Sequence, residues 1–316
     1  MKRDLTFSLF LPQVATDWPA LRAKALLLEQ QGWDGLWLVD HFFAGGSRGL
    51  DFFEGWTALS ALAEATDRLR LGLLVSCNSY RNPALVAKMA CTLDRISDGR
   101  LELGMGSGWM EEEYLAYGFE FAGIRERLDR LDEGLEIIRG MLSGGSTNFE
   151  GRYYKVLDAP CEPRPVQEPL PITVGGAGEK VLLRIVARHA TRWNCPMPEA
   201  PEIPRLRKVL EAHCREVGRD PDEITISEQT AVIIGRDEKQ VADKLELAKL
   251  MIGSFVDIDT MTVVGTPDQV TESLLAKTRG GVTDFTILFG DFGEPDSLEL
   301  FSEQVVPALR EGFASS

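Results

Sequence analysis

The fold is decided by two stretches of the sequence, LGLLVSCNSYRNPA at residues 71–84 and LELGMGSGW at residues 101–109. Each is an apolar run of strand length that ends in small, polar or glycine residues, and a helical pattern follows each of them. Such a unit places short side chains and backbone N–H groups at the carboxyl end of a parallel sheet, where α/β proteins bind ligands. Two such units in close succession indicate one site built by several strands, as in an enzyme.

The same plan is repeated along the chain, since apolar strands alternate with amphipathic helices. A doubly wound sheet is disfavoured because the first strand is followed by Pro12 rather than by a G-x-G-x-x-G loop. We therefore predict an α/β fold, a (β/α)8 TIM barrel that residues 1–316 form as a single domain, with an insertion at about 143–170. The expected strands are Leu5–Leu11, Gly35–Val39, Leu69–Ser76, Arg100–Met105, Pro171–Gly175, Thr191–Asn194, Glu223–Ile234, Met261–Val264 and Asp284–Leu288.

The helices expected between these strands carry apolar residues at helical spacing. Phe149–Tyr154, inside the insertion, is typical of a hairpin, and a proline-rich connection follows it. The expected helices are Asp17–Gln31, Phe53–Ala65, Ala84–Ile96, Arg125–Met141, Glu179–His189, Ile203–Val217, Glu238–Met251, Pro267–Thr278 and Leu298–Leu309.

Charge and composition exclude several classes of partner. The chain has 34 basic and 49 acidic residues and no basic cluster, which argues against nucleic acid and anionic membranes. No apolar run approaches the roughly 18–20 residues of a membrane span. The five cysteines are widely spaced and the chain has only three histidines, so we expect neither a disulfide framework nor a metal site. These features predict an acidic cytoplasmic protein with a small-molecule substrate.

Asp40 and His41 are the first candidates for catalytic residues, because they end the strand Gly35–Val39. Barrel enzymes carry catalytic groups at the carboxyl ends of their strands. His41 could exchange a proton near neutral pH, with Asp40 orienting its ring or raising its pKa. The alternative is a histidine packed in a loop. His189 and His213 fall on expected helices, where a surface or packing role is favoured.

Two glycine loops and two tryptophans are candidates for ligand binding. The loop Gly175–Gly178 precedes an expected helix, and such a loop offers free N–H groups to a phosphate. The second loop follows the fourth strand and contains the alternating glycines Gly104, Gly106 and Gly108. It indicates either close approach of the backbone to a ligand or a tight turn. Glu111–Glu113 read either as carboxylates beside the ligand or, as their placement favours, as the solvated first turn of a helix. The candidate binding residues are Gly106, Ser107, Gly108, Trp109, Gly175, Gly176, Ala177, Gly178, Trp193 and Asn194.

Several of these segments together resemble one known family. They occur in order between about Leu5 and Leu309, each on the expected element. The sequence is similar to the bacterial-luciferase-like flavin and deazaflavin oxidoreductases, and within them to the coenzyme F420-dependent branch. The segments that carry the resemblance are WDGLWLVDH at 33–41, SYRNPA at 79–84, RISDGRLELG at 95–104, GSGW at 106–109 with EEY at 112–114, FEGRYY at 149–154, GG at 175–176, WN at 193–194 and VGTP at 264–267.

The resemblance implies a barrel that holds a flavin or deazaflavin at the carboxyl ends of its strands and works as a homodimer. It implies that His41 acts beside the reactive ring carbon with Asp40 next to it. A non-prolyl cis peptide is expected at Leu74–Val75, and with Ser76 this segment would lie behind the ring. The basic cluster by which sugar-phosphate dehydrogenases of this family hold their substrate has no convincing equivalent here.

Three functions follow from the resemblance. The first is transfer of hydride between coenzyme F420 and a small organic substrate, which His41 and the loop at 106–109 favour. The second is an FMN-dependent monooxygenase that receives reduced flavin from a partner reductase. The third is a flavin-binding barrel without turnover. His41 and the later of the two glycine loops, Gly175–Gly178, argue against it.

Overall fold

The computed structural model describes residues 4–315 and forms a closed barrel of eight parallel strands. The chain order of the strands is also their order around the barrel, and β10 closes it by pairing with both β9 and β12. The predicted (β/α)8 barrel is thereby confirmed. Its strands are β1 (Thr6–Phe10), β2 (Gly35–Leu38), β3 (Arg70–Leu73), β5 (Leu101–Gly106), β8 (Ile172–Gly175), β9 (Arg192–Cys195), β10 (Thr225–Ile234) and β12 (Asp284–Phe289).

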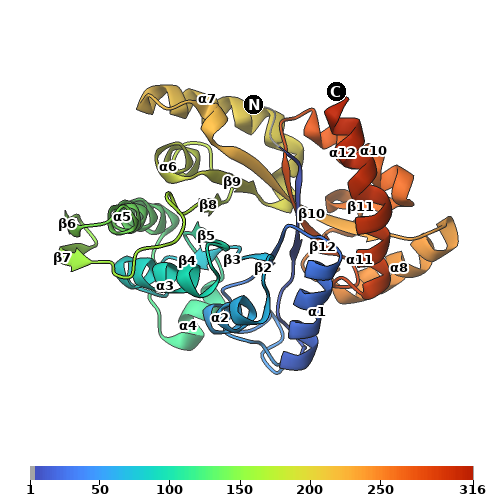
Figure 1. Cartoon of the computed structure of the whole chain (residues 1–316), viewed down its shortest axis with the longest axis horizontal. Coiled ribbons are helices and arrows are strands. Elements are labelled where there is room, and N and C mark those ends of the chain that lie inside the picture. Colours follow the sequence, from blue (N-terminus) through green and yellow to red (C-terminus); the bar gives the residue numbers. More distant parts are fainter. Residues whose placement is uncertain (1–3, 316) are drawn as a thin grey trace.

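Helices surround the strands on the outside of the barrel (Figure 1). The main ones bury an apolar stripe against the strands, as α5 does with Leu131, Leu135 and Ile138. Within residues 4–315, none of the helices has the length and apolar character of a membrane-spanning segment. The helices are α1 (Trp18–Gln30), α2 (Gly55–Ala65), α3 (Pro83–Ile96), α4 (Glu111–Tyr117), α5 (Ile124–Leu142), α6 (Leu182–His189), α7 (Ile203–Val217), α8 (Glu238–Met251), α9 (Ile258–Met261), α10 (Pro267–Thr278), α11 (Pro295–Leu300) and α12 (Val306–Ala314).

The expected hairpin is present as a separate two-stranded sheet, β6 (Ser146–Glu150) with β7 (Lys155–Pro160). It lies outside α5, away from the barrel (Figure 1). A further strand, β11 (Thr262–Gly265), pairs with the second half of β10 and extends the sheet beyond the ring. The last expected helix is divided into α11, a π-helical turn at Phe301–Val305, and α12.

The strand expected at Leu69–Ser76 is interrupted. It consists of β3 and of β4 (Ser76–Cys77), and both pair with β5. Gly72 is opposite Glu102, and Ser76 is opposite Met105. Between these two pairs the segment of β3 and β4 contains one residue more than β5, as in a β-bulge. The Leu74–Val75 peptide bond within this segment is cis, as predicted.

Glycine is required where these strands approach each other inside the barrel. A Cβ atom on Gly104 would lie 2.0 Å from the carbonyl oxygen of Leu73, and one on Gly72 would lie 2.4 Å from the ring of Trp37. Trp37 is buried and fills the space that the two glycines leave. The alternating glycines at the end of β5 are therefore partly a packing requirement of the barrel.

Arg100 joins several elements at the amino end of the barrel, opposite the carboxyl ends of the strands. Its buried guanidinium donates hydrogen bonds to the carbonyl oxygens of Ala63, Thr66, Leu69 and Ser97, at 2.6 to 3.0 Å. The same group also donates to the Thr66 hydroxyl. These bonds satisfy carbonyls at the end of α2 and in the loop that leads into β3.

We predict that Arg100→Met lowers the free energy of unfolding by about 3 kcal/mol, because the buried carbonyls lose their donor. Arg125→Met is the matched control: Arg125 is exposed and makes one ion pair with Asp129, four residues further along the helix. It should change stability by less than about 0.5 kcal/mol. Urea denaturation measures both values, and equal stability of the two variants would contradict the role of Arg100.

Candidate active site

A cavity of about 220 Å3 opens at the carboxyl ends of the barrel strands. Its wall consists of residues at the ends of β2, β3, β4, β5, β8 and β9 or in the loops that follow them, and of Gln229 within β10. Nine of the predicted site residues meet there: Asp40, His41, Leu74, Val75, Gly108, Trp109, Gly175, Gly176 and Asn194. Sequence reasoning missed four other lining residues, Cys77, Tyr80, Pro196 and Gln229.

A buried carboxylate holds His41 at the edge of this cavity. Nδ1 of His41 lies 2.9 Å from Oε2 of Glu113, whose side chain is completely buried. Glu113 also accepts hydrogen bonds from the Tyr80 hydroxyl, at 2.6 Å, and from the backbone N–H of Phe42. Burial raises the pKa of Glu113, but these interactions outweigh it and bring the pKa below its usual range. Glu113 is therefore ionised at neutral pH.

The expectation that Glu111–Glu113 form a solvated helical turn is wrong for Glu113. Glu111 and Glu112 are exposed, whereas Glu113 lies on the buried side of α4 with Met110 and Tyr114. These three residues follow the i, i+3, i+4 spacing of one helix face. That spacing was the signal in the sequence, and the acidic composition of the turn concealed it.

Asp40 has partners other than His41. Oδ2 accepts hydrogen bonds from the Arg81 guanidinium, at 2.7 Å, and from the Cys77 N–H, at 2.8 Å. Burial raises the pKa of Asp40, and the Arg81 charge opposes that rise. From the sequence we expected Asp40 to orient the ring of His41. In the structure Glu113 contacts that ring instead. Oδ1 of Asp40 is buried and has no hydrogen-bond partner within residues 4–315.

Leu74 and Val75 form an apolar part of the cavity wall. Val75 packs closely between two strands: a Cβ on Gly106 would lie 2.4 Å from its Cγ2, and one on Gly175 would lie 3.0 Å from its Cγ1. Larger residues at these glycines would displace Val75 from the wall. Gly108 has a φ of +77°, and a Cβ there would collide with the Tyr114 hydroxyl. The two glycine loops thus hold the wall in place.

The late glycine loop is held by β9. The Trp193 indole N–H donates to the carbonyl oxygen of Gly176 at 2.7 Å, and the Gly176 N–H donates to the Asn194 carbonyl at 3.0 Å. The helix α6 begins at Leu182, three residues later than expected, because residues 179–181 form turns instead.

Six predicted binding residues do not line the cavity: Ser76, Gly106, Ser107, Ala177, Gly178 and Trp193.

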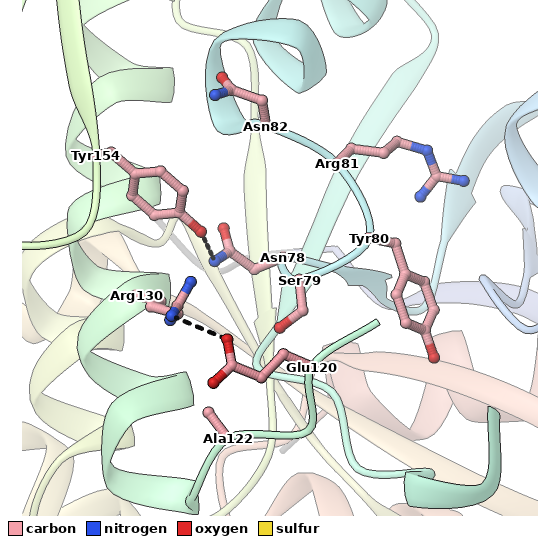
Figure 2. A pocket seen from close by; sticks show the side chains of 9 residues that line it. All are labelled: Asn78, Ser79, Tyr80, Arg81, Asn82, Glu120, Ala122, Arg130 and Tyr154. Carbon is pink, nitrogen blue, oxygen red and sulfur yellow. Dashed lines mark hydrogen bonds and ion pairs between the residues drawn. The ribbon is translucent and has the colours of Figure 1, made fainter. Parts of the chain in front are cut away.

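A second, more polar pocket of about 210 Å3 lies beside the first, with Tyr80 lining both. Figure 2 shows it between the loop at 78–82, the segment at 120–122 and α5. Asn78 donates to the Tyr154 hydroxyl at 3.1 Å, and Arg130 pairs with Glu120. In Figure 2 the guanidinium of Arg81 points away from this pair; it pairs instead with Asp40. Both arginines that line the pocket are paired with carboxylates.

Comparison with known proteins identifies the family. The family model described as luciferase-like monooxygenase matches residues 5–258. An F420-dependent glucose-6-phosphate dehydrogenase of Amycolatopsis mediterranei is 33% identical over 169 residues, which are 53% of this chain and 49% of that one. One of Kineococcus radiotolerans is 29% identical over 315 residues, covering 90% and 91%.

Among solved structures, an F420-dependent secondary alcohol dehydrogenase in complex with an F420-acetone adduct superposes with a TM-score of 0.84. The two chains are 19% identical over 97% of this chain and 99% of that one, a likeness that concerns the fold. The family model covers most of the barrel, including every segment that lines the cavity. The chain therefore belongs to the luciferase-like monooxygenase family of enzymes.

Proposed function

We propose that this protein is an F420-dependent oxidoreductase, which transfers hydride between the deazaflavin and a small organic substrate. The observation that carries the proposal is His41, which Glu113 fixes at the edge of a cavity with the apolar wall of Leu74 and Val75. The relatives named as F420-dependent dehydrogenases support it. The Asp40 and His41 roles and the binding residues remain proposals.

The residues of the cavity fit a planar heterocycle that carries N–H groups. Leu74 and Val75 offer it an apolar surface, and the buried Oδ1 of Asp40 lacks a donor. An unsatisfied buried carboxylate oxygen is costly, and a ring N–H would satisfy it. Gly175 and Gly176 allow the rest of the molecule to approach the backbone closely.

His41 would exchange the proton that accompanies hydride transfer. The bound deazaflavin supplies the hydride-accepting or hydride-donating carbon. Because Glu113 occupies Nδ1, Nε2 of His41 is the nitrogen left to give a proton to, or take one from, a bound substrate. The exposed indole of Trp109 lies edge-on to the His41 ring, with centroids 5.5 Å apart, and shields one side of it.

The lining of the cavity favours an uncharged substrate. None of the lining residues in the described part of the chain is lysine or arginine. A phosphate group is normally held by such residues or by several free N–H groups. We therefore propose a small alcohol or carbonyl compound rather than a sugar phosphate.

The alternative is an FMN-dependent monooxygenase with a partner reductase, and the description of the family model, luciferase-like monooxygenase, supports the monooxygenase part of it. Replacing the deazaflavin by FMN would leave the wall and the glycine loops in the same roles. The homodimer, the cytoplasmic location and the partner reductase stay predictions from the sequence.

Cofactor titration tests the proposal directly. We expect F420 to bind with at least tenfold higher affinity than FMN, measured by the change in fluorescence of each cofactor. Gly176→Asp should weaken F420 binding by about tenfold or more, because it adds a negative charge where an anionic cofactor approaches. Gly176→Ala is the control: it adds the same Cβ atom, 2.5 Å from Cδ2 of Leu182, without the charge, so it should bind F420 more tightly than Gly176→Asp does. Tighter binding of FMN would shift the assignment to the monooxygenase.

His41→Ala should lower kcat by about 10²–10⁴, since it removes the proposed proton-transfer group. The affinity for F420 should stay within about threefold, because the wall and the glycine loops are unchanged. His213→Ala, on α7, is the matched control and should leave kcat unaltered. Turnover of His41→Ala within a few-fold of the wild type would make His41 a packing residue.

Glu113→Gln should lower kcat by about tenfold, because a neutral amide cannot accept from all three donors that the carboxylate serves. The lowered pKa of Glu113 also sets a pH dependence. Its ionised form stabilises the fold above the pKa of a free glutamate, about 4.3, and this contribution disappears as the pH falls through the lower folded-state value. The stability difference between wild type and Glu113→Gln, measured by urea denaturation, should therefore shrink as the pH falls below about 4.

A further inference from the structure

Two cysteines outside the active site lie in contact with each other. The Sγ atoms of Cys91, on α3, and Cys161, directly after β7, are 3.1 Å apart, and both side chains are buried. All five cysteines are free thiols. Cys91 and Cys161 are the pair whose sulfurs interact in the described part of the chain; Cys77, in contrast, contacts the Tyr114 hydroxyl. Neither Cys91 nor Cys161 lines the cavity.

The segments that carry the two sulfurs are fastened to each other on one side of the pair. Asp94, one turn after Cys91, accepts hydrogen bonds from the backbone N–H groups of Val166 and Gln167, at 2.7 and 3.0 Å. Arg95 donates from Nε to the Arg164 carbonyl oxygen at 2.6 Å. These bonds fix the connection after Cys161 along α3, so the sulfurs meet in a defined geometry rather than by chance motion.

We propose that Cys91 and Cys161 are a thiol–disulfide site, oxidised by hydrogen peroxide. In the first step one sulfur attacks the peroxide, the O–O bond breaks, and a sulfenic acid and one water form. The second sulfur then attacks the sulfenic sulfur, which forms the S–S bond and releases a second water. Overall two thiols lose two electrons and two protons to one peroxide, and no further reactant is needed.

Burial makes this reaction selective. It keeps bulky reagents away from the two sulfurs, and it raises the pKa of the Cys91 thiol, so little thiolate is present at neutral pH and the oxidation is slow. A small neutral peroxide is the class of oxidant that can enter. Once the first sulfur is oxidised, the second lies in contact with it, which favours the disulfide over further oxidation.

The cross-link would join residues 70 positions apart in the sequence. The loop so closed contains β5, α4, α5 and the hairpin, and its closure restricts the unfolded chain. We expect the oxidised protein to melt about 5 °C higher than the reduced one. Because the pair lies outside the cavity, oxidation should leave the affinity for F420 unchanged within twofold. The disulfide and the binding of F420 are therefore tested by independent measurements, and either can fail without the other.

Thiol counting after peroxide treatment tests the proposal. The full chain is oxidised under native conditions, denatured in N-ethylmaleimide and weighed by mass spectrometry. Reduced protein should take up five maleimides and oxidised protein two fewer, and peptide mapping should find Cys91 linked to Cys161. Cys161→Ser should abolish both the loss of two thiols and the rise in melting temperature. Cys214→Ser, the control at a buried cysteine on α7, should retain both.

Two results would overturn the proposal. Wild-type protein that still takes up five maleimides after peroxide treatment would show that the pair does not form a disulfide. A loss of two thiols that persists in Cys161→Ser would assign the cross-link to other cysteines. Oxidation of both sulfurs to sulfinic acids, seen as added oxygen mass without a cross-link, would equally refute the disulfide.

Discussion

The structure of the site depends on one extra residue in the third strand of the barrel. Because this strand holds one residue more than β5 between their paired positions, Val75 is displaced into the space between the ends of β5 and β8. Gly106 and Gly175 are needed to accommodate it. The same displacement returns the chain to pairing at β4, where the Cys77 N–H reaches Asp40. The wall of the cavity and the position of the carboxylate are thus consequences of one packing constraint.

A second feature of the cavity is that each of its two buried carboxylates accepts hydrogen bonds from at least two donors, although Oδ1 of Asp40 receives none. Glu113 forms hydrogen bonds with a histidine, a tyrosine and a backbone N–H. Asp40 accepts hydrogen bonds from Arg81 and from a backbone N–H. Arg81 is in turn shared with Glu54, at the start of α2. These bonds connect the loops that follow β2, β4 and β5, so the side chains around His41 are positioned before any ligand binds.

Most of the fold was predictable from the sequence, because hydrophobic periodicity and loop chemistry are local signals. The helices at 203–217, 238–251 and 267–278 have the expected bounds. The family resemblance predicted the cis bond at Leu74–Val75. The partner of His41 was not predictable from neighbouring residues, since Glu113 is 72 positions away and is selected by tertiary packing. The start of α6 was misplaced because residues 179–181 suit a helix locally, whereas tertiary structure holds them in turns.

The position of Arg100 has a consequence for how this barrel can change in evolution. Its hydrogen bonds fasten the amino end of the barrel, whereas the cavity is formed at the carboxyl end. The contacts that resist unfolding and those that select a ligand therefore lie in different layers of the molecule. Substitutions in the loops around the cavity leave the Arg100 layer intact, so mutational tolerance is concentrated where new substrate preferences arise. A scaffold with this division can acquire different chemistries while its folding stays robust.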